Sequence, residues 1–95
     1  MIELDTRVRL ARKVRLRRDP RSSKMMLLYP ERGLELSDTA ADVAALCDGR
    51  TAAAIVDELA ARYAGVAREP IERDVLSFLR TLAERGLLAG GEETP

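Results

Sequence analysis

Few residues in this chain of 95 could carry out covalent chemistry. Cys47 is the only cysteine, and the chain has no histidine. Nucleophilic catalysis needs a base that activates the nucleophile, and this thiol has no imidazole to serve it. Cys47 falls on the apolar stripe of an expected helix, where a free cysteine is typically a small core residue. The same counts rule out a disulfide within the chain and argue against a Cys/His zinc site, so we expect no metal site.

The carboxylates do not suggest a catalytic pair either. Acid–base catalysis by two carboxylates requires a cleft that shifts the pKa of one of them. The candidates Asp57, Glu58, Glu72 and Asp74 lie at helical positions that face water, as in an ordinary solvated helix. No glycine-rich stretch has the spacing of a phosphate-binding loop. We therefore predict no catalytic residue, no cofactor and no enzymatic activity.

The charges balance overall but are unevenly distributed. Sixteen basic residues face sixteen acidic ones, which argues against a general nucleic-acid or membrane-surface binder. Through Arg32 the chain has ten basic and four acidic residues, a net charge of +6, and the remainder has six and twelve, a net charge of −6. The basic part is either a solvated hairpin or a surface that steers an acidic partner.

The stretch from Tyr29 to Leu36 organises the expected elements. Leu34 and Leu36 alternate around Glu35, which is the period of a strand with one buried face. Pro30 ends the incoming strand because it has no N–H, and Gly33 can supply the positive φ of a tight turn. If residues 33–36 form the edge of a sheet, one side of their backbone is unpaired. Such an edge is a place for another chain to dock.

Alternating apolar and basic residues predict one strand over residues 8–17, or two strands broken near Arg12. Residues 24–29 form the next expected strand, after a turn at residues 19–23. Helices are expected at residues 38–47, capped by Ser37 or Thr39, then after Thr51 up to Gly65, and from Glu69 to Gly86. Gly49 is expected to stop the first of them.

Strands followed by helices predict an α+β fold: a winged-helix-like domain with a small three-stranded antiparallel sheet followed by a three-helix bundle. The length fits a single domain over residues 1–95, with an ordered part at about residues 7–88. No segment reads as a signal peptide or a membrane span, and one unpaired cysteine suits a reducing compartment, so we expect a cytoplasmic protein.

Two binding functions fit this fold. A winged-helix transcriptional regulator would place its last helix in the DNA major groove, but that helix mixes arginines with acidic residues and would neutralise few phosphates. A peptide clamp would instead add a guest strand to the edge formed by Gly33, Leu34, Glu35 and Leu36. The groove beside that edge would be walled by residues of the last helix that lie off its core stripe: Arg73, Leu76, Ser77, Arg80 and Ala83.

An ordered set of short motifs resembles the PqqD family of pyrroloquinoline quinone (PQQ) biosynthesis. These motifs are Tyr29-Pro30-Glu31, Leu34-Glu35-Leu36, Thr39-Ala40, Leu46-Cys47-Asp48-Gly49, Asp74-Val75, Phe78-Leu79 and Gly86-Leu87-Leu88. The resemblance covers residues 8–88. It departs at Ala52-Ala53-Ala54, where relatives often carry an acidic residue.

The resemblance implies a non-catalytic peptide chaperone, a recognition element for a ribosomally made and later modified peptide. Such a protein binds the PqqA precursor peptide and presents it to the radical SAM enzyme PqqE. By position, the peptide would add a strand beside Gly33, Leu34, Glu35 and Leu36, against the last helix near Arg73, Leu76 and Arg80. Separately, the long N-terminal hairpin could exchange between protomers about its turn at residues 19–23 and give a homodimer.

Overall fold

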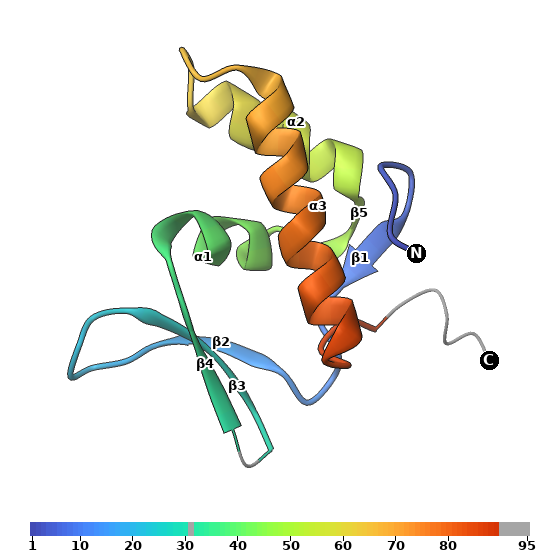
Figure 1. The fold of residues 1–95 in the computed structure, drawn as a ribbon. Helices are drawn as coiled ribbons and strands as arrows, with labels where there is room; N and C mark the ends of the chain where they lie inside the picture. The colour runs from blue at the N-terminus through green and yellow to red at the C-terminus, as the bar shows by residue number, and fades with distance from the viewer. Residues whose placement is uncertain (31, 90–95) are drawn as a thin grey trace.

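The computed structural model describes residues 1–30 and 32–89, and the chain has an α+β fold. Figure 1 shows the three helices stacked above one face of a three-stranded sheet, with a smaller sheet near the N-terminus. The elements, in chain order, are β1 (Arg7–Arg9), β2 (Arg15–Arg18), β3 (Met25–Tyr29), β4 (Arg32–Leu36), α1 (Asp38–Ala45), β5 (Asp48–Thr51), α2 (Ala52–Arg62) and α3 (Arg68–Glu84).

The three-stranded antiparallel sheet has the order β2-β3-β4, which confirms the predicted sheet. The proposed role of Gly33 in the turn is wrong: Gly33 lies inside β4 and is not among the positive-φ residues. Its small size fits close packing instead, because a Cβ there would lie 3.2 Å from Met26 Cε and 3.3 Å from Leu28 Cδ2. Glu31, in the connection itself, lies outside the described residues.

The stretch predicted as one strand over residues 8–17 forms two strands in two different sheets. The break lies between Leu10 and Val14, around Arg12, as the second alternative expected. β1 pairs antiparallel with β5, which was not predicted because its sequence, Asp-Gly-Arg-Thr, has no apolar alternation. Gly49 lies inside β5 with φ +106° against the Arg9 guanidinium, so it does not serve as the stop of α1.

The three helices lie where periodicity predicted them, and two of them have the expected caps. Ser37 Oγ accepts a hydrogen bond from the Ala40 N–H at 3.1 Å, and Thr51 Oγ1 accepts one from the Ala54 N–H at 3.1 Å. Each cap satisfies a backbone donor that has no partner within the helix. No helix among the described residues is both long and apolar enough to span a bilayer.

The core consists of two neighbouring clusters. One joins α2 and α3 to β1 and includes Cys47, which confirms that this cysteine is a core residue. The other joins the inner face of the three-stranded sheet, through Leu27 and Leu36, to α1 and the end of α3. Phe78 packs against both clusters. The sheet is therefore fixed to the helices by its inner face, and this fixes the position of β4.

Candidate functional site

β4 is an edge strand. It pairs with β3 on one side, and no strand among the described residues pairs with its other side. The Asp19 N–H donates to the Lys24 carbonyl at 2.8 Å, which makes these two residues a directly hydrogen-bonded pair. Because bonded and non-bonded pairs alternate along an antiparallel ladder, Met25, Leu27 and Tyr29 bond towards β4. The backbone N–H and C=O of Gly33 and Glu35 therefore point outward, away from the sheet.

The side chains of β4 alternate between the core and water. Leu36 is buried and Leu34 half-buried, and both pack into the core beneath the sheet. Gly33 and Glu35 lie on the exposed face, where Glu35 pairs with Lys24 at 3.4 Å. Both partners of this ion pair are more than half exposed, so it contributes little to stability. The free backbone of β4 is thus held in place by its two leucines.

A groove with a volume of about 580 Å³ opens between α1 and α3, where β4 leads into α1. We call it the α1–α3 groove. Its floor consists of apolar side chains of both helices and of α2: Val43, Leu59, Ile71, Val75 and Phe78. Hydroxyl groups and one carboxylate form its rim: Ser37, Thr39, Asp74, Ser77 and Thr81. An apolar floor with a few polar groups at the rim is typical of a binding groove.

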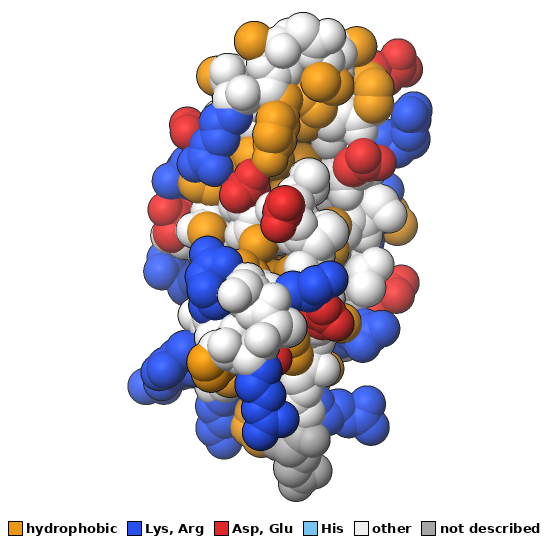
Figure 2. Space-filling model, turned by 90° about the vertical axis from the view of Figure 1, so that its left-hand side faces the viewer, with side chains coloured by type: hydrophobic (Ala, Val, Ile, Leu, Met, Phe, Trp, Pro, Cys, Tyr) orange, Lys and Arg blue, Asp and Glu red, His pale blue; other side chains and the backbone are white. Residues whose placement is uncertain are grey.

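The far end of the α1–α3 groove is closed by Tyr63 and Val66. Tyr63 donates a 2.5 Å hydrogen bond from its hydroxyl to Asp42 Oδ2, which raises the pKa of the tyrosine. Arg62 lies 3.7 Å from the other carboxylate oxygen of Asp42. These contacts join the middle of α1 to the end of α2. Figure 2 shows hydrophobic side chains exposed in the upper half of the molecule and basic side chains gathered over the lower half.

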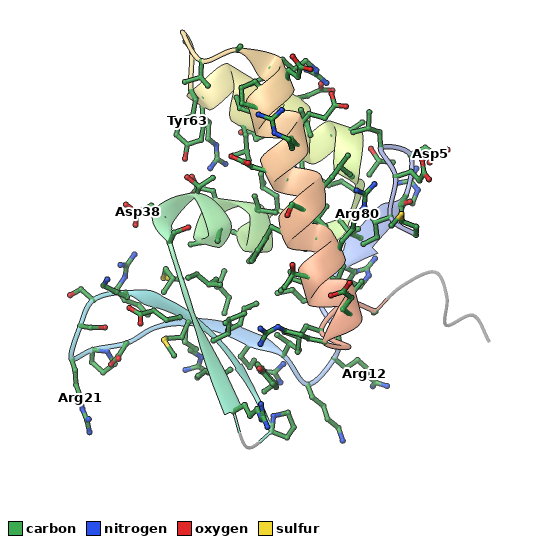
Figure 3. The ribbon with its side chains drawn as sticks, in the orientation of Figure 1. Asp5, Arg12, Arg21, Asp38, Tyr63 and Arg80 are labelled. Carbon is green, nitrogen blue, oxygen red and sulfur yellow. The ribbon has the colours of Figure 1, made fainter. Side chains whose placement is uncertain are left out.

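The structure separates the residues of α3 that the sequence grouped together. Ser77 lines the α1–α3 groove, whereas Arg73, Leu76 and Arg80 do not. Leu76 packs against the α2–α3 core cluster, and the Arg80 guanidinium donates two hydrogen bonds to the Ile2 carbonyl, at 3.1 and 2.9 Å. Figure 3 shows Arg80 on the side of α3 that faces the N-terminal segment, away from Tyr63 and Asp38.

Sequence reasoning missed the groove residues Asp74, Phe78 and Thr81. Together with Ser77 they follow the i, i+3, i+4, i+7 spacing of one helical face. Phe78 follows the apolar period of the core stripe, together with Ile71, Val75, Leu79 and Leu82, whereas Asp74 was expected on the solvated face. The signal that was missed is the mixture of apolar and polar residues on one helical face. Such a face can supply both the apolar floor and the polar rim of a groove.

The chemistry of this site is suited to binding. Burial, and secondarily the charge of Asp48, raises the pKa of Cys47 to about 12, so its thiol stays protonated at neutral pH. Among residues 1–30 and 32–89, no cluster of three or more cysteine and acidic side chains could hold a metal ion. What the site offers is unpaired backbone on β4 and apolar surface in the adjacent groove.

Solved structures share this fold. The solution structure of the PqqD part of PqqCD from Methylobacterium extorquens, described as a stand-alone recognition element for ribosomally synthesised and modified peptides, matches with a TM-score of 0.77. It is 39% identical, and the match covers 93% of this chain and 94% of that one. TbiB1 in complex with the TbiA(beta) leader peptide matches with a TM-score of 0.73 at 28% identity, over 86% of this chain and 95% of that one.

Several relatives by sequence are named for PqqA binding. A PqqA binding protein of Rhodopseudomonas palustris strain TIE-1 is 42% identical over 86 residues, which are 90% of this chain and 83% of the relative. A PqqA binding protein of Xanthomonas axonopodis pv. citri is 42% identical over 88 residues, which are 92% and 95% of the two chains. The family model for coenzyme PQQ synthesis protein D matches residues 24–88. The chain therefore belongs to the PqqD family.

Proposed function

We propose that this protein is a non-catalytic carrier that binds the PqqA precursor peptide by strand addition to β4 and presents it to the radical SAM enzyme PqqE. The observation that carries the proposal is the free edge of β4. There the N–H and C=O groups of Gly33 and Glu35 can form the ladder of an added strand. Two kinds of relatives support it: proteins named for PqqA binding, and a fold match described with a leader peptide bound.

The α1–α3 groove supplies the second part of the interaction. A strand paired with β4 would lead towards this groove, because β4 itself runs into Ser37 and the first turn of α1. An apolar side chain of the peptide could then cover the floor near Phe78. Main-chain bonds would supply affinity for any extended chain, and the groove would supply selectivity among sequences. We propose that the peptide contacts the face of α3 that carries Ser77. The alternative is that the peptide contacts the face with Arg73, Leu76 and Arg80.

A DNA-binding function receives less support. Of the arginines on α3, Arg68 pairs with Asp57 at 2.6 Å and Arg80 bonds to the Ile2 carbonyl. The acidic residues Glu69, Glu72, Asp74 and Glu84 share the same helix. Few positive charges remain on α3 to neutralise phosphates. A gel shift with duplex DNA at low salt tests this function, and we expect no retardation.

The decisive experiment removes one outward N–H from β4. In Glu35→Pro the lost N–H is one that β3 does not use, and proline is tolerated at such edge positions. Glu35→Ala is the matched control, because it removes the same side chain but keeps the N–H. We expect calorimetry with PqqA peptide to show about tenfold weaker binding by the proline variant, or about 1.4 kcal/mol, and near-native binding by the alanine variant.

Equal peptide affinity for the two Glu35 variants would show that β4 does not receive the peptide. Thermal unfolding of both variants serves as the folding check. Leu34→Pro is unsuitable for this purpose, because the Leu34 N–H points to β3 and its loss would damage the sheet itself. Presentation to PqqE is a further part of the proposal. Exchange of the N-terminal hairpin between protomers is a separate question, which sedimentation at several concentrations answers.

A further inference from the structure

The three-stranded sheet has an outer face that no described element covers. Figure 1 shows all three helices on the opposite, inner side of this sheet. The register aligns the outward side chains in two rows across the strands, Arg15–Leu28–Gly33 and Arg17–Met26–Glu35. We call these six residues the outer sheet face. All are exposed except Met26, which is half-buried.

The centre of the outer sheet face is apolar. Leu28 is 40% exposed and is one of only three large hydrophobic residues exposed to this degree in the described part of the chain. Met26 lies beside it on the same strand and the same face. Methionine adapts to irregular partner surfaces, and methionine and arginine are both enriched in protein interfaces. A phosphate backbone would not cover these two side chains, so they favour a protein partner over a nucleic acid.

The charge on the outer sheet face is uncompensated. Glu35 is already paired with Lys24, and neither Arg15 nor Arg17 forms an ion pair with any described residue. The guanidinium of Arg15 donates a hydrogen bond only to the neutral carbonyl of Arg12, at 3.0 Å. Two more arginines near the two ends of β2, Arg12 and Arg21, are also exposed; Figure 3 shows Arg21 at the turn between β2 and β3 and Arg12 beside the end of α3. A partner that complements this face must be acidic.

The outer sheet face is continuous with the peptide edge. A guest strand bonded to Gly33 and Glu35 would lie beside β4 and extend both rows, with alternate side chains on the same face. A protein that docks on this face would therefore touch the guest strand as well. This protein and its bound peptide would then form one continuous surface for the docking protein.

We propose that the outer sheet face is a docking surface for a folded protein that presents acidic residues around an apolar patch. This inference rests on the proposed function, which makes PqqE the protein to use as the probe. It places the docking surface for the partner protein on the side of the sheet opposite the core. It also states the chemistry of that surface: arginines of β2 flank the apolar side chains of Met26 and Leu28.

The test measures two affinities for the same variants, with purified PqqE and with PqqA peptide. Arg17→Glu reverses a charge on the outer sheet face. Arg85→Glu makes the same change at an exposed position just after α3 and is the matched control. At about 50 mM salt we expect Arg17→Glu to bind PqqE at least roughly tenfold more weakly, and Arg85→Glu to bind it within about twofold of wild type. Leu28→Ser should weaken PqqE binding without changing its salt dependence.

The peptide measurement separates this inference from the proposed function. All three variants should bind PqqA peptide like the wild type. If the wild type fails to bind the peptide, the proposed function fails. If peptide binding is intact but PqqE binds Arg17→Glu as tightly as wild type, or does not bind the wild type, the docking surface is wrong. Retardation of duplex DNA that is lost in Arg17→Glu would make this face a nucleic-acid site and would also overturn the proposal.

Discussion

At the scale of single residues, the two most perturbed ionisable groups adjoin each other in the chain and act on structure. The buried Cys47 thiol donates a hydrogen bond to the Val43 carbonyl at 3.3 Å and has a pKa of about 12. It is a helix-end packing residue with no reactive thiolate at neutral pH. Asp48 follows it at the start of β5, and its carboxylate accepts hydrogen bonds from the Arg50 side chain at 3.0 and 2.9 Å.

The Asp48–Arg50 pair predicts a pH dependence of stability. The hydrogen bonds from Arg50 lower the pKa of Asp48 from 3.8 to about 2. A carboxylate with a lowered pKa adds stability above its unfolded-state pKa, and this contribution disappears as the pH falls through the folded-state value. We therefore expect the Tm of Asp48→Asn to lie below that of wild type at pH 6, with the difference shrinking between about pH 4 and pH 2.

The matched control for Asp48→Asn is Asp5→Asn, which removes an exposed carboxylate without an ion pair to any described residue. Its Tm should stay near the wild-type value at pH 6. A difference for Asp48→Asn that persists at pH 2 would show that the amide disturbs β5 by its shape and not through the lost charge.

At the scale of elements, periodicity predicted the three helices and the hairpin β3–β4, because each has an apolar face that repeats with its own period. It did not predict β5, whose residues are polar and whose partner strand lies far away in the sequence. Nor could it decide which flank of the α3 core stripe faces the open groove. Both flanks mix polar and apolar residues. The Ile2 segment occupies one of them, and that contact is visible only in three dimensions.

The same substitution is expected to affect PqqA affinity differently on the two flanks of α3. Ser77 and Ala83 are both small and exposed, but only Ser77 lines the α1–α3 groove. Ser77→Arg would place a long charged side chain at the groove, and we expect it to weaken PqqA binding by about tenfold or more. Ala83→Arg adds the same side chain outside the groove and should leave the affinity within about twofold of wild type.

Calorimetry with PqqA peptide measures both α3 variants, with thermal unfolding as the check on folding. The reverse result, with Ala83→Arg weakened and Ser77→Arg unchanged, would assign the peptide to the side of α3 that carries Arg73, Leu76 and Arg80. In that case the peptide would have to displace the Ile2 segment from Arg80.

At the scale of the whole molecule, the charge asymmetry of the sequence has a spatial counterpart. The basic part, through Arg32, supplies β1, β2 and β3, and the acidic part supplies all three helices. Figure 2 shows the resulting separation of basic side chains towards one end. The sheet carries both proposed surfaces. Its β4 edge would hold the peptide, and its outer face would meet the partner protein.

The pairing of β2 with β3 also bears on whether the N-terminal hairpin exchanges between protomers. In the structure β2 pairs with β3 of its own chain across a turn closed by local bonds. Asp19 accepts hydrogen bonds from the Arg21 N–H at 2.9 Å and from the Ser22 hydroxyl, and Ser23 adopts φ 65°. These bonds favour the closed hairpin. Deleting Arg21 and Ser22 removes these bonds and leaves only Pro20 and Ser23 between the paired residues Asp19 and Lys24, and short hinges under strain promote domain swapping.

We therefore expect wild type to sediment mainly as a monomer over a range of concentrations, and the two-residue deletion to sediment as a dimer. Peptide stoichiometry should stay at one per chain in both forms, because exchange about residues 19–23 leaves β4 paired only with β3 of its own chain. A wild-type dimer that binds one peptide per two chains would show instead that β4 edges pair with each other. The edge proposed for the peptide would then be covered by a second copy of the chain.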